Sequence, residues 1–312
     1  DFYFTPKIKE RGGKQTLTFT AAVSSSQFIV FEYQINADSY MIDFSVRSEG
    51  MVRLMNTRKQ QNITWDLKAF RNSKSIEYEN RYHELTYSFE DDKIDYLSVS
   101  SSDEEEDNNV HWIAFKQHFF NSILIPAKSF ESVWFTSESL LDSDIVDQQF
   151  TKKYHAEIPV NVSGEILQNF QWYFGPTEYK TLAKYDLGIE ESIDFGWGIF
   201  GWINKYVFVP TFNFLSSFLP YGIAIIIMTV LVRLVMSPVT YKSYVSQIKM
   251  KVLKPEVDVI TEKFKDDSVK RQQETMALYS KAGANPMSGC LPALIQLPVF
   301  YALFSFFPVA FA

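Results

Sequence analysis

The sequence has little of what metal and disulfide chemistry require. Among 312 residues it holds one cysteine, Cys290, and four histidines. A single thiol excludes an internal disulfide framework and any site built from several thiolates. The histidines are scattered, without the spacing of metal ligands, at His83, His111, His118 and His155. We therefore expect neither a metal site nor a cofactor.

The sequence also lacks the motifs of the common enzyme classes. It contains no nucleophile elbow, no HExxH run and no Walker loop. An intramembrane protease needs a serine beside a histidine or a lysine, and the apolar segments 221–241 and 286–311 contain neither of those bases. The sequence therefore predicts a protein that is not an enzyme. A membrane-anchored hydrolase ranks third among the functions that we consider.

Charge divides the chain into two different parts. Residues 1–220 carry 20 Lys+Arg against 31 Asp+Glu, whereas residues 221–312 carry 10 against 6. The acidic first part repels phosphate, so we expect no direct recognition of nucleic acid. The chain has no signal peptide at its start and is still apolar at its end. We expect the natural protein to be longer at both ends.

The first 190 residues alternate apolar and polar side chains in short runs, which is typical of strands. Short strands without helices between them favour an antiparallel β-sandwich for residues 1–190. We interpret the acidic run 103–107 as a solvated loop rather than a cation site. The strand candidates are residues 16–20, 40–46, 63–67, 122–125, 133–136 and 156–163.

Residues 196–219 are rich in aromatic side chains, and Lys205 is the only charge after residue 198. About 20 such residues suffice to span a bilayer. The segment could instead lie flat, with Trp197, Trp202 and other aromatic rings at the level of the lipid headgroups. Pro210 and the scattered asparagines and serines favour the second interpretation, an interfacial amphipathic helix.

Two later segments are apolar enough to cross a membrane. Residues 221–241 contain no charge before Arg233. Residues 286–311 contain no charge at all, although Pro292, Pro298 and Pro308 interrupt them. Prolines are tolerated in such helices where neighbouring groups satisfy the freed carbonyls. We predict a transmembrane helix in each segment.

The polar residues 242–282 between the two spans predict a helical hairpin. Residues 266–268 supply a turn and a helix start. The first arm has one apolar face, formed by Leu253, Val257, Ile260 and Phe264. The second arm places Val269, Met276 and Tyr279 on one side.

The charge of the hairpin predicts the topology of the chain. Residues 242–281 carry nine Lys+Arg, and the positive-inside rule therefore places them in the cytoplasm. Residues 1–190 must then be periplasmic. The fold class is mixed: an antiparallel β-sandwich followed by an α-helical membrane region with a cytoplasmic helical hairpin.

Several stretches resemble one family of membrane proteins. Residues 225–240, with Arg233 followed by Met236-Ser237-Pro238, are similar to the second transmembrane helix of the YidC/Oxa/Alb membrane protein insertases. The run 285–303, NPMSGCLPALIQLPVFYAL, is similar to the start of the third helix of that family. Residues 112–120 and 173–176 resemble the periplasmic domain of Gram-negative members. The family core has five transmembrane helices, and this chain shows two of them.

The resemblance implies a function and a place. It implies a multi-pass protein of the bacterial inner membrane that inserts membrane proteins, alone or with the Sec translocon. Its partners would be nascent membrane proteins, the lipid bilayer, the Sec translocon, and the ribosome or signal recognition particle machinery at residues 242–281. A transporter or channel subunit with a periplasmic sensory domain is the alternative.

The resemblance also implies roles for individual residues. Arg233, Thr229 and Gln296 would line a hydrophilic groove that binds substrate. Leu297, Pro298 and Phe300 match a hydrophobic slide along which a nascent helix leaves the groove.

Each of these residues also has a plainer interpretation. A guanidinium near the centre of a span costs about 2.5–3.5 kcal/mol, and Arg233 could avoid that cost by snorkelling to the basic end of its helix. Gln296 could hydrogen-bond a neighbouring helix. The slide residues could simply face lipid or pack against other helices.

Overall fold

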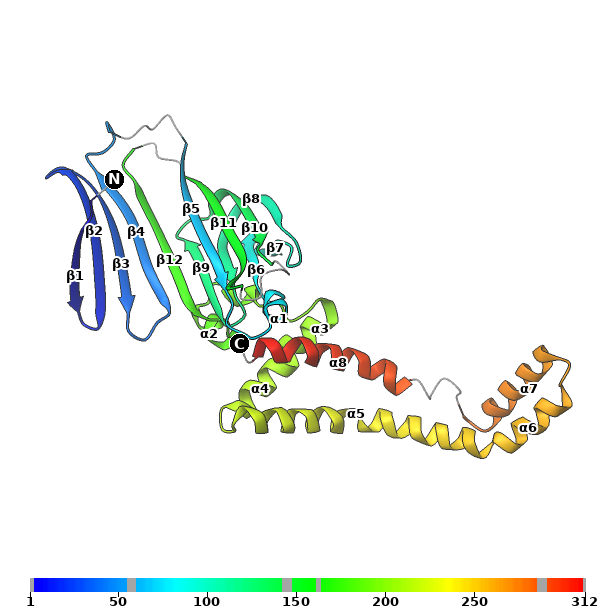
Figure 1. Ribbon diagram of the computed structural model, residues 1–312. Helices are drawn as coiled ribbons and strands as arrows, with labels where there is room; N and C mark the ends of the chain where they lie inside the picture. The colour runs from blue at the N-terminus through cyan, green and yellow to red at the C-terminus, as the bar shows by residue number, and fades with distance from the viewer. Residues whose placement is uncertain (1–2, 55–59, 142–147, 161–163, 285–290, 311–312) are drawn as a thin grey trace. The chain divides into compact units, whose positions relative to one another are not determined.

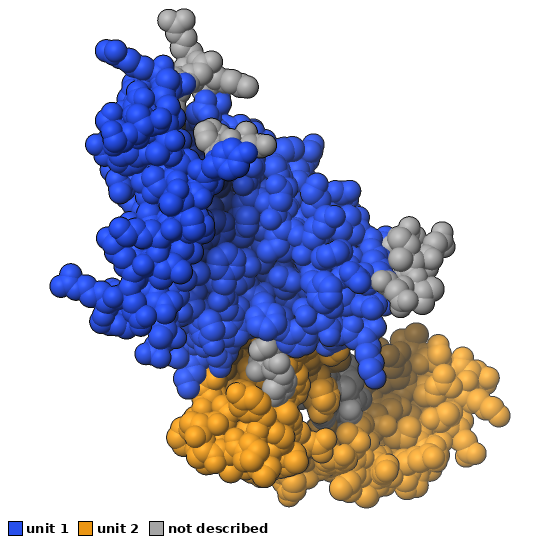
Figure 2. All heavy atoms as spheres, turned by 60° about the vertical axis from the view of Figure 1, so that its left-hand side comes forward, with its two compact units in different colours: residues 1–193, 311–312 blue, residues 194–310 orange. Residues whose placement is uncertain are grey.

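The computed structural model describes residues 3–54, 60–141, 148–160, 164–284 and 291–310. Contacts divide the chain into two compact units, with the boundary between Ile193 and Asp194 (Figure 2). The first unit is built mainly from strands and the second from helices (Figure 1).

Unit 1 is a 12-stranded antiparallel sheet with the order β1-β2-β3-β4-β12-β9-β8-β10-β11-β5, in which β6 pairs with β7 and β8. The strands are β1 (Thr5–Arg11), β2 (Lys14–Ser24), β3 (Gln27–Asn36), β4 (Met41–Glu49), β5 (Gln61–Phe70), β6 (Glu84–Phe89), β7 (Lys93–Tyr96), β8 (Asp103–Lys116), β9 (Phe120–Pro126), β10 (Phe130–Ser139), β11 (Phe150–Val160) and β12 (Leu167–Pro176). Short helical turns lie outside the sheet: α1 (Ile76–Asn80), α2 (Tyr179–Leu182), η1 (Ala183–Tyr185) and η2 (Ile189–Ser192).

Strand β8 belongs to both layers of the fold. Its residues 103–110 pair with β10, whereas its residues 113–116 lie between β6 and β9. Between the two halves, Asn109 has φ +53°, in the left-handed region that asparagine tolerates better than most residues. The chain therefore changes direction at Asn109, and one continuous sheet closes over a shared core.

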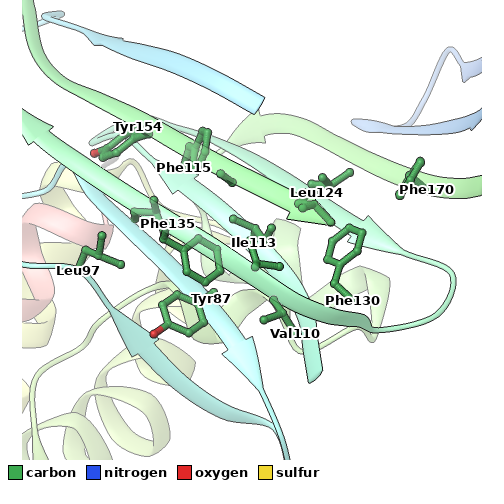
Figure 3. Packing of buried hydrophobic residues seen from close by; sticks show 14 of the residues in the cluster. Tyr87, Leu97, Val110, Ile113, Phe115, Leu124, Phe130, Phe135, Tyr154 and Phe170 are labelled. Carbon is green, nitrogen blue, oxygen red and sulfur yellow. The ribbon is translucent and has the colours of Figure 1, made fainter. Parts of the chain in front are cut away.

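Aromatic pairs in that core join strands that are not neighbours in the sheet (Figure 3). Tyr87 of β6 stacks on Phe135 of β10 with ring centroids 4.3 Å apart. Trp65 of β5 stacks on Phe115 of β8 at 3.7 Å. Such contacts require two layers facing each other, so the predicted antiparallel β-sandwich is confirmed.

The acidic run 103–107 is a correction to the sequence interpretation. It is not a loop, because it forms the first part of β8 and pairs with β10 from Val133 to Ser137. The side chains of residues 103–106 are exposed, so the backbone gains its partners while the carboxylates stay in water. The hydroxyl of the buried Tyr87 donates hydrogen bonds to Glu105 and Asp107. The acidic composition of this run correctly predicted that its side chains are solvated. It wrongly predicted a loop, because the backbone forms a strand.

Most strand candidates lie inside observed strands. Residues 16–20, 63–67, 122–125 and 133–136 fall in β2, β5, β9 and β10, and residues 41–46 fall in β4. The candidate 156–163 belongs to β11 as far as Val160, and residues 161–163 lie outside the described part of the chain.

Unit 2 begins with a tight turn that leads into helical residues. The side-chain amide of Asn204 donates to the carbonyl of Phe195 over 2.7 Å. The turn brings Gly201 so close to Gly196 that a Cβ on Gly201 would lie 2.0 Å from the carbonyl oxygen of Gly196. A side chain at position 201 would therefore force this turn to shift.

The helical elements of the unit are α3 (Gly198–Ile203), the π-helix η3 (Asn204–Phe208), α4 (Val209–Ser216), α5 (Tyr221–Val252), α6 (Lys254–Lys263), α7 (Ser268–Lys281) and α8 (Leu291–Ala310).

The helical stretch from α3 to α4 is two-sided. Phe208, Phe212 and Leu215 are 4–6% exposed, and the rings of Phe208 and Phe212 both contact Phe306 of α8. The opposite side exposes large aromatic rings, including Trp202. The aromatic composition of residues 196–219 is thus divided between a packed face and an open face.

Helix α5 is longer than the apolar segment 221–241. It continues to Val252, so residues 242–252 extend the same helix instead of starting a separate arm. Its 32 residues measure about 48 Å at 1.5 Å per residue, more than the hydrocarbon thickness of about 30 Å. In the described residues, one helix, α5, is long and apolar enough to cross a membrane. The apolar part of α8, Leu294–Val309, is shorter, and residues 286–290 and 311 of the second predicted span are outside the described ranges.

Helices α6 and α7 lie at the predicted turn. Asp267 caps α7, and its carboxylate accepts the N–H of Lys270 over 2.9 Å. The predicted face of the first arm, residues 253, 257, 260 and 264, is half-buried while its neighbours are exposed.

The face predicted for the second arm is wrong in part. Val269 and Met276 are 65% and 50% exposed. Arg271, Thr275 and Leu278 are half-buried in their place. The stem of an arginine and the methyl group of a threonine can cover apolar surface, which a ranking by hydrophobicity does not show.

Candidate functional site

Helix α5 buries one narrow face within unit 2. Ala224 and Met228 are 0% and 1% exposed, whereas Ile226 is 64% exposed. Residues four apart lie on the same face of a helix, so Ala224 and Met228 define the side on which α5 packs.

A row of polar residues follows a different face of α5. At about 100° per residue, Arg233 lies about 140° from Met228 around the helix and about 40° from Thr229. Ser237 and Thr240, four and seven residues after Arg233, continue the same face. We call Thr229, Arg233, Ser237 and Thr240 the polar stripe.

The members of the polar stripe differ in how their side chains are satisfied. The hydroxyl of Thr229 donates to the carbonyl of Ile225 over 2.9 Å, and that of Thr240 to the carbonyl of Met236 over 3.0 Å. The guanidinium of Arg233 is exposed, and the part of the chain that the structure describes places no carboxylate within ion-pair distance of it. Arg233 is thus a cation available to groups from outside this segment.

A proline adds a polar backbone group beside Arg233. Pro238 lies inside α5 and has no N–H to donate, so the carbonyl of Leu234 loses its usual partner four residues ahead. A freed carbonyl needs water or another donor. This turn of α5 therefore has more unsatisfied polarity than its apolar composition indicates.

Helix α8 runs beside α5 in the opposite direction (Figure 1). The ring of Phe212 in α4 contacts both helices, at 5.7 Å from Tyr221 and 5.6 Å from Phe306. Counted from these contacts at 1.5 Å per residue, Arg233 lies about 18 Å along α5 and Gln296 about 15 Å along α8. The two polar residues therefore lie at similar levels on different helices.

The apolar site residues of α8 do not share a single face. The helix buries Ala302 and Phe306, which are 0% and 1% exposed. Leu297 and Phe300 lie about 140–160° from Ala302 around the helix and are 61% and 56% exposed. Pro298 is about 40° from Ala302 and is half-buried. Leu297 and Phe300 thus form an outward apolar face, and Pro298 lies on the packed side.

The structure adds residues that the sequence reasoning missed. Phe304 is 72% exposed and continues the outward face one turn after Phe300. Ser237 and Thr240 extend the polar stripe. Each could have been found from its helical spacing to a predicted site residue. Phe304 lies four residues after Phe300, and Ser237 and Thr240 lie four and seven residues after Arg233.

The structure joins the candidate residues into two groups. Thr229 and Arg233 share one face of α5, and Leu297 and Phe300 share one face of α8. Gln296 is exposed, and among the described residues no hydrogen bond links it to α5.

Family comparisons cover nearly the whole chain. The family described as the YidC periplasmic domain matches residues 2–210, and the family described as the 60Kd inner membrane protein matches residues 213–312. The two matches meet in α4, inside unit 2.

Relatives named membrane protein insertase YidC match along 99% of the chain. The protein of Parabacteroides distasonis is 35% identical over 323 residues, which are 50% of its own length. The proteins of Phocaeicola vulgatus and Bacteroides fragilis are both 37% identical, over 51% of their own lengths. The chain spans about half the length of these curated relatives.

Proposed function

Because the chain belongs to the YidC family of membrane protein insertases, we propose that it is part of an insertase that moves nascent membrane proteins into the bacterial inner membrane. The family consists of insertases and not of enzymes. The same matches favour this function over a transporter or channel subunit. The observation that carries the proposal is the polar stripe, with Arg233 at its centre, on a helix long and apolar enough to cross a membrane.

The polar stripe would act as one wall of a hydrophilic groove. An arginine at the centre of a span costs about 2.5–3.5 kcal/mol unless water or a counter-charge compensates it. In a partly wet site of effective dielectric constant near 20, two charges 4 Å apart attract by about 4 kcal/mol, against about 1 kcal/mol in water. Arg233 would therefore draw a short polar, acidic segment of a substrate into the groove, with Thr229 and Gln296 beside it.

The outward face of α8 would let the substrate leave. Leu297 and Phe300 present apolar surface at the level of the groove, and Pro298 has no N–H to donate to the carbonyl of Leu294 one turn earlier. Burial of each apolar side chain of a nascent helix in lipid contributes about 1.5–3 kcal/mol. Partition into lipid would drive release, so the mechanism needs no nucleotide or cofactor.

The distribution of charge along the chain and the exposed aromatic side of α3–α4 support a multi-pass topology. The nine Lys+Arg of residues 242–281, which form the end of α5 and the α6–α7 hairpin, favour the cytoplasm for this stretch, and unit 1 would then be periplasmic. Helices α5 and α8 would both cross the membrane. The open aromatic side of α3–α4 favours a position flat in the periplasmic headgroup layer.

The hairpin is the part of the chain suited to cytoplasmic partners. Its exposed basic side chains would meet the ribosome or the signal recognition particle machinery. We propose the Sec translocon as a second partner for substrates that need both.

Substitution of Arg233 tests the groove. Insertion of two substrates that differ only in acidic residues of the translocated segment would be measured by protease protection in proteoliposomes. Arg233→Ala should reduce insertion of the acidic substrate by at least tenfold, and Arg233→Lys should retain most of it because the charge remains. Val235→Ala is the matched control, since Val235 is 77% exposed and lies about 160° away around the same helix.

The same experiment separates the groove from snorkelling. If Arg233 only reaches for the interface, removal of its charge lengthens the apolar span and leaves both substrates inserted. Near-normal insertion of the acidic substrate by Arg233→Ala would therefore refute the proposed role of this residue.

A further inference from the structure

Exposed aromatic rings gather at one end of unit 1. Phe70, Tyr78 and Phe120 are 48%, 41% and 55% exposed. Phe70 is the last residue of β5, and Phe120 is the first of β9. We call these three residues the aromatic rim.

Contacts place the rim residues around one turn of unit 1. The backbone N–H of Phe70 donates to the side-chain carbonyl of Gln117 over 3.2 Å. The ring of Tyr78 lies 6.0 Å from that of His118, which in turn lies 4.2 Å from Phe119. The rim therefore surrounds the turn at residues 117–120 between β8 and β9.

The opposite end of the sheet provides the comparison for the rim. Leu167 begins β12, and this strand pairs antiparallel with β9 so that Pro176 lies opposite Phe120. The exposed apolar residues at the Leu167 end are the aliphatic Val23, Leu54 and Leu167, at 63%, 55% and 67%, and the aromatic Tyr3 and Phe4, at 89% and 42%. The choice of the rim as the membrane-facing end therefore rests on where the chain leaves unit 1 as well as on its aromatic rings. Aromatic rings are enriched where protein meets the headgroup region of a bilayer, because they combine an apolar body with polarisable or polar edges.

The chain leaves unit 1 from the rim end. The ammonium of Lys116 donates to the carbonyl of Ser192 over 3.1 Å, which fixes the last turn of the unit beside β8. Helix α3 begins six residues later at Gly198. Six extended residues span at most about 22 Å. Whatever arrangement the two units adopt, this end of unit 1 is tethered within that reach of α3, whose N-cap Trp197 is 73% exposed.

We propose that the aromatic rim of unit 1 is a membrane-docking surface that enters the headgroup layer of the bilayer that α5 crosses. The partner is the lipid surface itself. The inference rests on the proposed membrane location of α5 and is independent of substrate insertion. The rim would hold unit 1 against the membrane so that the end with Phe70, Tyr78 and Phe120 faces the lipid.

Spin labels can test this in the complete protein. Cysteines would replace Phe70, Tyr78 or Phe120 one at a time, in a background with Cys290→Ala. Each nitroxide would be exposed to oxygen, which partitions into lipid, and to a water-soluble nickel complex, in nanodiscs of phosphatidylethanolamine with a minor share of phosphatidylglycerol. Leu167→Cys is the matched control at the other end, and Ile226→Cys on α5 is the lipid standard.

The rim labels should show an oxygen-to-nickel accessibility ratio several-fold above that of position 167 and below that of position 226. Rim labels as open to nickel as position 167 would overturn the proposal. Rim labels protected from both reagents would also overturn it, because they would be covered by protein. A water-exposed label at position 226 would instead show that the membrane location of α5 has failed.

Discussion

The buried histidine of unit 1 makes stability depend on pH. His83 is 0% exposed, and its Nδ1 lies 2.5 Å from the hydroxyl of Thr151. Its Nε2 lies 3.6 Å from the carboxylate of Glu79, too far for a hydrogen bond. Glu79 is itself held by the backbone N–H groups of Asn72 and Ser73.

Burial lowers the pKa of His83 from 6.5 to about 4. The charge of Glu79 opposes this shift, and the nearby cationic groups of His118, Lys152 and Lys116 add to it. Below pH 6.5 the unfolded chain takes up a proton that the folded unit does not. The stability present near pH 7 is therefore lost progressively as the pH falls from 6.5 towards 4.

The magnitude follows from the two pKa values. One pKa unit corresponds to about 1.4 kcal/mol. Proton linkage between pKa values of 6.5 and about 4 then gives a loss of about 2 kcal/mol at pH 5, and about 3 kcal/mol in the acid limit. A loss of that size is a large part of the stability of an ordinary domain.

Urea titrations followed by the near-ultraviolet circular dichroism of the tryptophans would measure this effect. His83→Gln should remove most of the pH-dependent loss between pH 7 and pH 5, whatever it does to stability at pH 7. His111→Gln, at a partly exposed histidine beside Asp92, is the matched control and should keep the loss. Equal losses in the wild type and in His83→Gln would refute the reasoning.

Two further predictions concern a buried ion pair and the hairpin. Lys116 and Glu84 lie 2.5 Å apart with side chains only 10% exposed, so Lys116→Met should cost about 3–5 kcal/mol in a urea titration. The double variant Lys116→Met/Glu84→Leu should regain most of that loss. If the losses in free energy of unfolding of the two single variants simply add in the double variant, the pairing is contradicted. A cysteine at Asp266, beside the cap of α7, should react with a membrane-impermeant maleimide only in inside-out vesicles. Labelling from the periplasmic side would overturn the proposed topology.

Periodic features of this chain were predictable because they are local. The alternation in residues 63–67 and 133–136 comes from side chains that point to opposite faces of one strand. The cap at Asp267 depends on a carboxylate and an N–H three residues apart. Composition alone identified the apolar part of α5.

Features that depend on distant partners were not predictable in this way. The acidic residues of β8 form a strand because β10 supplies their backbone partners. Arg271 turns inward because α6 packs against α7. The faces of α8 likewise followed only from its contacts with α4 and α5, and they place Pro298 apart from Leu297 and Phe300.

The bend in β8 at Asn109 has a consequence for how unit 1 is assembled. One half of β8 needs β10, and the other half needs β6 and β9, so neither layer closes until all of these segments have emerged. Strand β4 can pair with β12 only after residue 170 has been synthesised, because Phe44 pairs with Phe170. Pairings so distant in sequence give a high contact order and slow folding. Until β12 has been synthesised, the early strands would thus remain unpaired edges, and pairing with β12 would then cover them.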